Sequence, residues 1–226
     1  MAKVNSWILY SKKTVTQTKM VLGGLARYVR TKQYNEFEKF AQPSENSNVL
    51  DVGVSDSEKI EGTNLFERLY PYPESLTIAS IEDDKKIKKL YPNAKVIKIF
   101  PNQKLPFKNG EFDIAVSWAT LEHVGGYKKQ AMFINELLRV GKKVFITTPY
   151  RACPYEPHTG FFLLHWLPLN LFRWFCIVFN NKFWVDEANL NPLYVKDVLK
   201  MRLEKKVKVR IYKMFGIIPS HLIITI

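Results

Sequence analysis

The chain has 226 residues, of which 46% are hydrophobic, and its formal net charge is +13. This length can bury a full hydrophobic core, so we expect a single domain with additions. Its two cysteines, Cys153 and Cys176, form neither a CxxC pair nor a zinc spacing, which excludes a disulfide framework and suits a reducing compartment. No uninterrupted apolar core leads to a cleavage site near the first residue, so we expect a cytoplasmic protein without a signal peptide. The positive charge indicates an anionic partner, such as a nucleic acid, a phosphorylated metabolite or an acidic membrane face.

Residues 1–46 mix lysine and arginine with apolar side chains and are expected to form a helical N-terminal cap. The pair Gly23-Gly24 interrupts the pattern, which favours two short helices over one. From Tyr34 to Phe40, aromatic residues recur at helical spacing. Two interpretations remain for this segment: a basic arm that touches substrate or membrane, or a solvated helical cap over a sheet.

The stretch VLDVG, at residues 49–53, is the centre of the predicted fold. A short apolar run that carries Asp51 and ends at Gly53 predicts a buried strand followed by a tight turn. Glycine has no Cβ, so the backbone there allows a ligand to come close. An open α/β sheet usually binds its ligand at this end of a strand.

Strands and helices alternate after this turn. We expect helices at 65–70, 85–90 and 127–140, and further strands at 76–81, 94–100, 113–118 and 144–148. This alternation favours a parallel sheet with right-handed crossovers. A last helix is expected over 191–203, with Pro192 in its first turn.

The ordered set of motifs resembles the class I S-adenosylmethionine-dependent methyltransferases. The motifs in this set are VLDVG, the acid Glu82 after the second strand, LPFKNGEFDIAVSWATLEHV at 105–124 and RVGKKVFITTP at 139–149. The resemblance covers residues 47–150 and implies S-adenosylmethionine as cofactor. It also implies an α/β, Rossmann-like fold: an open, mostly parallel seven-stranded sheet with helices on both faces, a helical N-terminal cap, and an apolar insertion after the fifth strand. Residues 191–226 would then supply the closing helix and two closing strands.

The resemblance also implies a set of cofactor-binding residues. Asp51 would lie near the amino group of the cofactor's methionine part, where a carboxylate faces a cation. Gly53 would admit the cofactor close to the backbone, and Glu82 would accept hydrogen bonds from both ribose hydroxyls. Ser117 and Trp118 end the fourth strand and are expected to line the cleft. There Trp118 either packs against the sulfonium or belongs to the core.

The chain departs from the family pattern at two places. Family members commonly have further glycines where this chain has Ser55 and Ser57, so the loop that holds the cofactor is less permissive here. Many members carry an acid after the third strand that meets the amine of adenine; here Asn102 or Gln103 is expected to supply an amide oxygen instead. The GxGxxG turn of an NAD site is absent, because Ser55 and Glu58 stand where glycines are required.

Residues 151–190 form an insertion that is dense in Phe, Trp, Leu and Pro. Its motifs EPHTG and LHWLP are similar to a bacterial branch of the family whose members often lie among enzymes of cell-surface polysaccharide synthesis. Residues 161–179 are apolar enough to suggest a membrane span, but four residues interrupt the run: His165, Pro168, Asn170 and Arg173. We therefore interpret the insertion as a cap over the substrate cleft. It either lies peripherally on an anionic membrane or is a purely structural lid.

Methylation of an oxygen acceptor also removes a proton, which requires a base with a pKa near neutral. His123 follows the fourth strand, on the cleft side in this fold, and is the first candidate for the base; a structural histidine is the alternative. His158 lies in the insertion beside Glu156, and we expect both to be catalytic residues that bind the acceptor. Glu122 and His123 form half of a metal site, but the sequence shows no third ligand at a suitable spacing, so we predict no metal.

Three functional classes remain open. We favour a methyltransferase that acts on a small molecule or a glycan, with oxygen as the acceptor atom. The second class is a nucleic-acid methyltransferase, which the positive charge suggests. Because the basic residues are scattered and no RNA-binding module is recognisable, we expect no specific nucleic-acid partner. The third class is a non-catalytic binding protein on a decayed methyltransferase fold, which Ser55 and Ser57 keep open.

Overall fold

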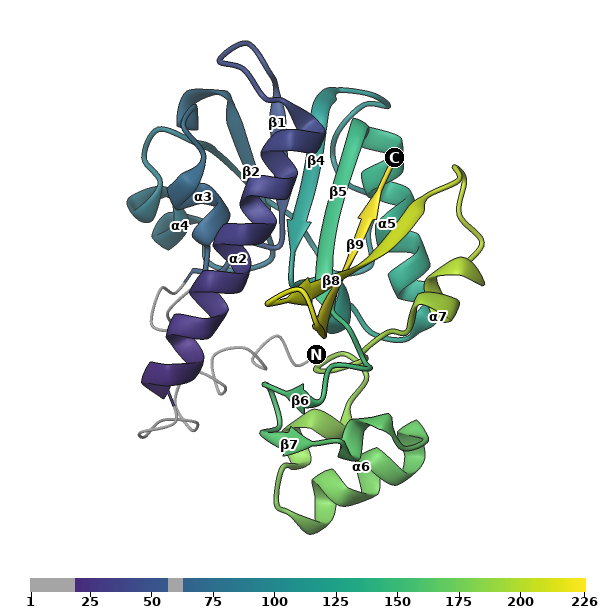
Figure 1. Cartoon of the computed structure of the whole chain (residues 1–226). Helices are drawn as coiled ribbons and strands as arrows, with labels where there is room; N and C mark the ends of the chain where they lie inside the picture. Colours follow the sequence, from purple (N-terminus) through teal and green to yellow (C-terminus); the bar gives the residue numbers. More distant parts are fainter. Residues whose placement is uncertain (1–18, 57–62) are drawn as a thin grey trace.

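The computed structural model describes residues 19–56 and 63–226, and within Lys19–Leu22 only the backbone. A seven-stranded sheet forms its centre (Figure 1). The strands are β1 (Val49–Val52), β2 (Leu76–Ser80), β3 (Lys95–Lys98), β4 (Phe112–Trp118), β5 (Gly141–Pro149), β8 (Lys208–Met214) and β9 (Ile218–Thr225). Their order is β3-β2-β1-β4-β5-β9-β8; β1 to β5 pair in parallel, and β9 pairs antiparallel with both β5 and β8. The predicted α/β, mostly parallel, seven-stranded fold is confirmed.

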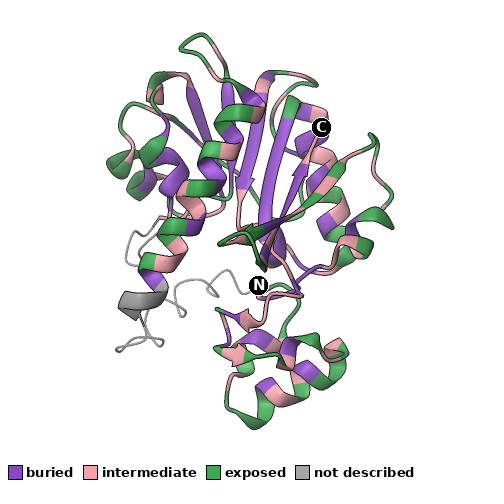
Figure 2. Ribbon diagram, viewed as in Figure 1, coloured by how far each residue is buried: buried purple, intermediate pink, exposed green. Residues whose placement is uncertain are grey.

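Helices cover both faces of the sheet. They are α2 (Lys19–Ala41), α3 (Leu65–Leu69), α4 (Asp84–Leu90), α5 (Tyr127–Val140) and α7 (Val195–Leu199). A further helix, α6 (Leu169–Val178), lies below the sheet and covers neither face (Figure 1). One hydrophobic cluster joins Phe37 of α2, Phe66 of α3 and Ile87 of α4 to β1, β2 and β4, and a second joins α5 and α7 to the opposite face. The central strands are accordingly buried on both sides, as parallel strands require (Figure 2).

Two predicted helices differ in the structure. The prediction of two short N-terminal helices is wrong, because α2 continues through Gly23-Gly24. Each glycine costs a helix interior about 1 kcal/mol relative to alanine, and burial of Val29, Phe37 and other residues of the same face offsets this cost. The helix predicted over 191–203 is also wrong in its extent. The segment before α7 is held extended instead, since the Arg151 N–H donates to the carbonyl oxygen of Leu193. The basic arm predicted at the start of the chain lies, through residue 18, outside the described residues.

Residues 151–190 form a small lobe below the carboxyl ends of the parallel strands (Figure 1). The lobe contains the short strands β6 (Tyr155–Glu156) and β7 (Phe161–Phe162) together with α6. It has its own small core, made by Phe172, Cys176, Trp184 and Leu190. Within the described part of the chain, no helix combines the length and the apolarity that a membrane crossing needs.

Candidate active site

The chain reverses its strand order between β1 and β4, so the carboxyl ends of these two strands flank the point where open α/β sheets bind ligands. Gly53 follows β1 with a φ of +106°, in the left-handed region that favours glycine. Thr120, just after β4, lies against it: a Cβ on Gly53 would be 2.2 Å from Thr120 Oγ1. The two turns are therefore packed so closely that only glycine fits at position 53.

Glu82 lies just beyond the carboxyl end of β2 and is half-buried. The hydroxyl of Ser80 donates to the carbonyl oxygen of Val54 (2.6 Å), and the Glu82 N–H donates to the same hydroxyl (3.0 Å), so Ser80 ties Glu82 to the turn after β1. Burial, and then the neighbouring Asp56 carboxylate, raise the pKa of Glu82. Its own carboxylate forms no hydrogen bond or ion pair with any described residue, which leaves both oxygens for a ligand.

Asp51 is buried in the middle of β1, where its side chain is hydrogen-bonded to that of Glu67 from α3. Burial, and then the charge of Glu67, raise the pKa of Asp51 well above its ordinary value. Burial also raises the pKa of Glu67 to about 7, although Arg30 and Arg68 act in the opposite direction. The two carboxyl groups therefore share a proton.

This shared proton predicts how stability depends on pH. The folded protein holds it more tightly than the unfolded chain does. The shared proton therefore adds to the free energy of unfolding at acidic pH, and this stabilisation is lost as the pH rises through about 7. The free energy of unfolding falls by at most about 1.4 kcal/mol per pH unit from this cause. We expect urea unfolding of Glu67→Gln to show a flatter loss of stability than the wild type between about pH 5 and pH 8. The exposed Glu74→Gln is the control, and equal slopes in all three proteins would contradict the shared proton.

The other predicted cofactor residues lie in different environments. The Ser117 hydroxyl is fully buried and donates to the carbonyl oxygen of Val52 (2.8 Å), so it joins β4 to β1. The Ser55 backbone is bonded in both directions by the side chain of Asn64. Asn102 has a φ of +59° in an exposed turn after β3, with no hydrogen bond to the other predicted residues.

The Trp118 ring packs in the core, stacked on Phe66 with the ring centroids 5.5 Å apart. Its indole N–H is buried, and no described residue accepts a hydrogen bond from it. The ring therefore belongs to the hydrophobic cluster on the α2 face, while its polar edge stays available.

Glu122 and His123 lie in a short 3-10 helix, Leu121–His123, that follows β4. Glu122 is completely buried, and its Oε2 accepts from the Thr148 hydroxyl (2.9 Å). Nδ1 of His123 lies 2.5 Å from the carbonyl oxygen of Asn189, so this nitrogen carries the proton. Burial lowers the pKa of His123 to about 3, which makes it a neutral imidazole and a weak base. Burial raises the pKa of Glu122, and the nearby charge of His158 acts against this.

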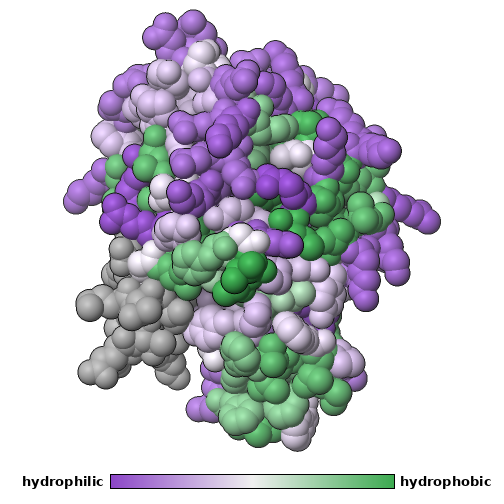
Figure 3. Space-filling view, in the orientation of Figure 1, coloured by the Kyte–Doolittle hydropathy of each residue, from purple (hydrophilic) through white to green (hydrophobic). Residues whose placement is uncertain are grey.

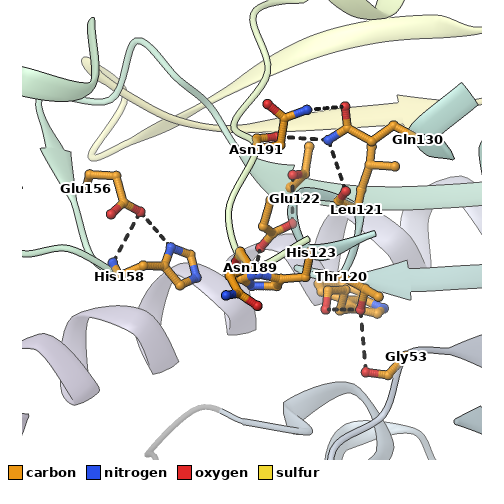
Figure 4. A network of polar contacts seen from close by, with 12 residues as sticks. Gly53, Thr120, Leu121, Glu122, His123, Gln130, Glu156, His158, Asn189 and Asn191 are labelled. Atoms are coloured by element: carbon orange, nitrogen blue, oxygen red, sulfur yellow. Dashed lines mark hydrogen bonds and ion pairs between the residues drawn. The ribbon is translucent and has the colours of Figure 1, made fainter. Parts of the chain in front are cut away.

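His158 comes from the lobe, in the turn between β6 and β7, and its ring meets that of His123 edge to face with the centroids 4.9 Å apart. Its Nδ1 lies 2.6 Å from Oε1 of Glu156. Burial disfavours charge on both groups, but their mutual attraction outweighs it: the pKa of Glu156 falls to about 2 and that of His158 rises. The backbone N–H groups of His158 and Thr159 also donate to this carboxylate. The structure thus brings the three predicted catalytic residues into one cluster (Figure 4).

A buried amide pair joins α5 to Asn191, the residue that follows the lobe, beside this cluster. Gln130 of α5 donates to the carbonyl oxygens of Leu121 and Asn191, and the Asn191 side chain donates back to Gln130 and to Gly125 (Figure 4). The Asn191 N–H also donates to the carbonyl oxygen of Glu122. These bonds hold Asn191 next to the 3-10 helix that carries His123.

Sequence reasoning missed several residues of this site. Glu67 and Ser80 lie in no motif, and Thr120 lies within the stretch 105–124 but had no role assigned to it. Each acts through a partner that is distant in the sequence. Arg30 was one of several basic residues on the N-terminal helix. In the structure its positive charge acts on Glu67, Glu122 and His158. The sequence indicated only that Arg30 is one of several basic residues in a predicted helix, and not which acids it would lie near.

Residues 71–144, from just before β2 into β5, match a family model described as a methyltransferase domain. No curated protein matches the chain. The match includes Glu82, Ser117 and His123 but stops before the lobe.

Solved structures share the fold over most of the chain. An S-adenosylmethionine-dependent methyltransferase from Mesorhizobium loti is 11% identical, with a TM-score of 0.53 over 83% of this chain and 94% of that chain. The magnesium protoporphyrin IX methyltransferase of Synechocystis, with S-adenosylhomocysteine bound, is 10% identical, with a TM-score of 0.52 over 98% of this chain and 93% of that chain. A methyltransferase from Methanosarcina mazei is 14% identical, with a TM-score of 0.50 over 81% and 93%. At these identities the likeness shows a common fold.

Proposed function

We propose that this chain is a class I S-adenosylmethionine-dependent methyltransferase that methylates a hydroxyl group of a small-molecule or glycan acceptor; the match of residues 71–144 to a methyltransferase domain and the shared fold support this. The observation that carries the proposal is the meeting of His123 from the core with His158 from the lobe, at the sheet edge where such folds bind ligands. In this proposal residues 47–150 hold the cofactor and the lobe holds the acceptor.

The proposed cofactor site uses the turns after β1, β2 and β4. Gly53 admits the cofactor to the backbone, Glu82 accepts from the ribose hydroxyls, and the Asp51–Glu67 pair supplies negative charge near the methionine amino group. The buried indole N–H of Trp118 is a further donor at this edge. Ser55 and Asn102 contribute at the rim.

In the proposed reaction the acceptor oxygen forms a bond to the methyl carbon as the bond from that carbon to the sulfonium sulfur breaks. S-Adenosylhomocysteine leaves, and the hydroxyl proton passes to water. Positioning and exclusion of water supply most of the acceleration for such a displacement. We propose that the hydroxyl binds at the His123–His158 pair. Transfer of labelled methyl to a panel of nucleotide sugars and lipid-linked glycans tests this function, and transfer only to nucleic acid would overturn it.

Glu82→Ala is expected to weaken cofactor binding. The loss of a charged acceptor for two hydroxyls should cost about 1.5–3 kcal/mol, which is roughly a 10- to 100-fold rise in Kd. Calorimetry with S-adenosylhomocysteine measures it. Asp84→Asn is the control, because Asp84 is partly exposed on α4 and its carboxylate pairs with Lys88. An unchanged Kd in Glu82→Ala would remove Glu82 from the site, and no binding by the wild type would favour a non-catalytic protein.

We also propose that the lobe binds peripherally to the surface of an anionic membrane. Its surface is apolar (Figure 3), with these large hydrophobic side chains exposed: Phe162, Leu163, Trp166, Leu171, Trp174, Ile177, Val178 and Phe179. The charged residues between 161 and 185 are Arg173 and Lys182, and both are basic. Aromatic and aliphatic side chains next to basic ones are typical of helices that lie in a membrane interface.

Vesicle flotation tests this contact. We expect the protein to float with vesicles that contain phosphatidylglycerol more than with pure phosphatidylcholine, and less so at high salt. The double variant Trp174→Ser, Phe179→Ser should lose most of this binding. Phe100→Ser is the matched control, because Phe100 is equally exposed but lies after β3, outside the lobe. Equal flotation of both variants would reject the lobe as the contact surface.

A further inference from the structure

One buried and two partly buried side chains converge where the lobe meets the core. Glu122, His123 and His158 each offer one ligand atom, and these atoms lie within 4.8 Å of one another. Nε2 of His123 is 3.6 Å from Oε1 of Glu122. Two of the residues follow β4 and the third comes from the lobe, so no spacing rule in the sequence could group them.

The surroundings fix which atoms point inward. Nδ1 of His158 is bonded to the Glu156 carboxylate and Nδ1 of His123 to the carbonyl oxygen of Asn189. Each ring therefore directs Nε2 toward the third residue, Glu122. An imidazole whose Nδ1–H is held by a carboxylate or a carbonyl is the usual form of a metal-binding histidine.

Glu122 provides an independent observation. Its side chain is fully buried, and its Oε2 accepts a hydrogen bond from the Thr148 hydroxyl. No described residue donates a hydrogen bond to its Oε1. A buried carboxylate oxygen without a partner is costly, because its charge has lost the solvation of water. This oxygen is the one that faces the imidazole of His123. A cation between the three residues would satisfy it.

We propose that Glu122, His123 and His158 bind a divalent transition-metal ion such as Zn²⁺. Two imidazole nitrogens and one carboxylate oxygen suit Zn²⁺, Fe²⁺ or Co²⁺ better than Mg²⁺ or Ca²⁺. Three protein ligands leave a position open, as in catalytic rather than structural zinc sites. The prediction of no metal rested on the lack of a third ligand near Glu122 in the sequence, and the lobe provides it.

The ion would have two consequences. It would bind the lobe to the core, because its ligands come from both. If the proposed hydroxyl methylation is right, the acceptor hydroxyl would occupy the open position, where the ion favours loss of its proton to water before methyl transfer. Binding of the ion itself does not depend on that function.

Calorimetry on the full chain, first stripped of metal with a chelator, tests the site with Zn²⁺. We expect one ion per chain and a higher melting temperature when it is bound. Glu122→Gln and His158→Gln should weaken binding by at least about 100-fold. Glu156→Gln, which removes the carboxylate behind His158, should weaken it by about 10- to 100-fold. Glu67→Gln is the matched control, a buried glutamate away from the cluster, and should keep the wild-type affinity. Co²⁺ in place of Zn²⁺ should give visible absorption that Glu122→Gln and His158→Gln lack.

Two results would overturn the proposal. One is the absence of Zn²⁺ binding by the wild type, which would mean that a proton on His158 satisfies Glu122. The other is binding that Glu122→Gln, His158→Gln and Glu156→Gln leave unchanged, which would place the ion elsewhere. If Zn²⁺ binds as expected but the metal-free protein transfers methyl groups at the same rate, the site stands and its role in hydroxyl activation is wrong. If Zn²⁺ binds and no hydroxyl compound is methylated, the site stands and the proposed function fails.

Discussion

Gly53→Ala is expected to abolish detectable cofactor binding and to destabilise the fold. The φ of +106° is strained for any residue with a Cβ, which costs about 1–3 kcal/mol. In addition, the new Cβ would lie 2.2 Å from Oγ1 and 2.5 Å from Cγ2 of Thr120, so the turns after β1 and β4 have to separate. Those turns form the proposed cofactor site. Calorimetry with S-adenosylhomocysteine and urea unfolding measure the two effects.

A control separates backbone strain from the clash. Gly216 has a φ of +77°, and no atom lies within 4 Å of a Cβ placed there, so Gly216→Ala should show strain alone. Adding Thr120→Gly to Gly53→Ala removes the clashing atoms and should restore part of the stability. Gly53→Ala that binds the cofactor as tightly as the wild type would show that this turn is not the site.

The sheet could be predicted from sequence because each strand carries its own local signal. The runs at 49–52, 76–80 and 144–148 are mostly apolar or β-branched, so their pattern does not depend on distant residues. The same local reasoning failed at α2, where two glycines suggest a break. Tertiary contacts of Phe37 with the rings of Phe66, Trp118 and Phe145 hold that helix against the sheet, and these contacts are invisible in the sequence.

The site could be predicted only as single residues. Gly53 was recognisable as a turn glycine, but the residue that requires it, Thr120, lies 67 positions further on. Asp51 was recognisable as an acid in a strand, but its environment depends on Glu67, whose helix has no motif. The pairs Gly53–Thr120 and Asp51–Glu67 could not be predicted, because each pair depends on which strands and helices become neighbours in the fold.

The same reason explains the histidine cluster. His123 and His158 each stood out as polar residues in suitable segments, and the sequence offered no ground for placing their rings in contact. The contact depends on the lobe lying below β4, and the Gln130–Asn191 amide pair fixes the residue at which the chain leaves the lobe. Burial lowers the pKa of both rings, but only His123 stays neutral, because at His158 the Glu156 carboxylate outweighs burial and raises the pKa.

Substitutions in the lobe are expected to lower the rate of methyl transfer and to leave cofactor binding unchanged. Glu156 accepts hydrogen bonds from Nδ1 and the backbone N–H of His158 and from the Thr159 N–H, so Glu156→Ala frees the ring that faces the acceptor. We expect methyl transfer by Glu156→Ala and His158→Ala to fall by about 10²- to 10⁴-fold, as is usual when a group that positions or ionises the reacting atoms is lost. The Kd for S-adenosylhomocysteine should stay nearly unchanged, because the turns after β1 and β2 are untouched.

The paired measurement is calorimetry and transfer of labelled methyl on the same protein samples, with Lys182→Ala as a control that changes an exposed residue of the same lobe. A loss confined to kcat would place His158 at the reacting atoms, whereas a rise confined to KM would make it a binding residue. The lobe is purely structural if these variants lose cofactor binding or melt early to the same degree as they lose activity. In that case the acceptor is held by the core alone, and the contact between His123 and His158 serves only to attach the lobe.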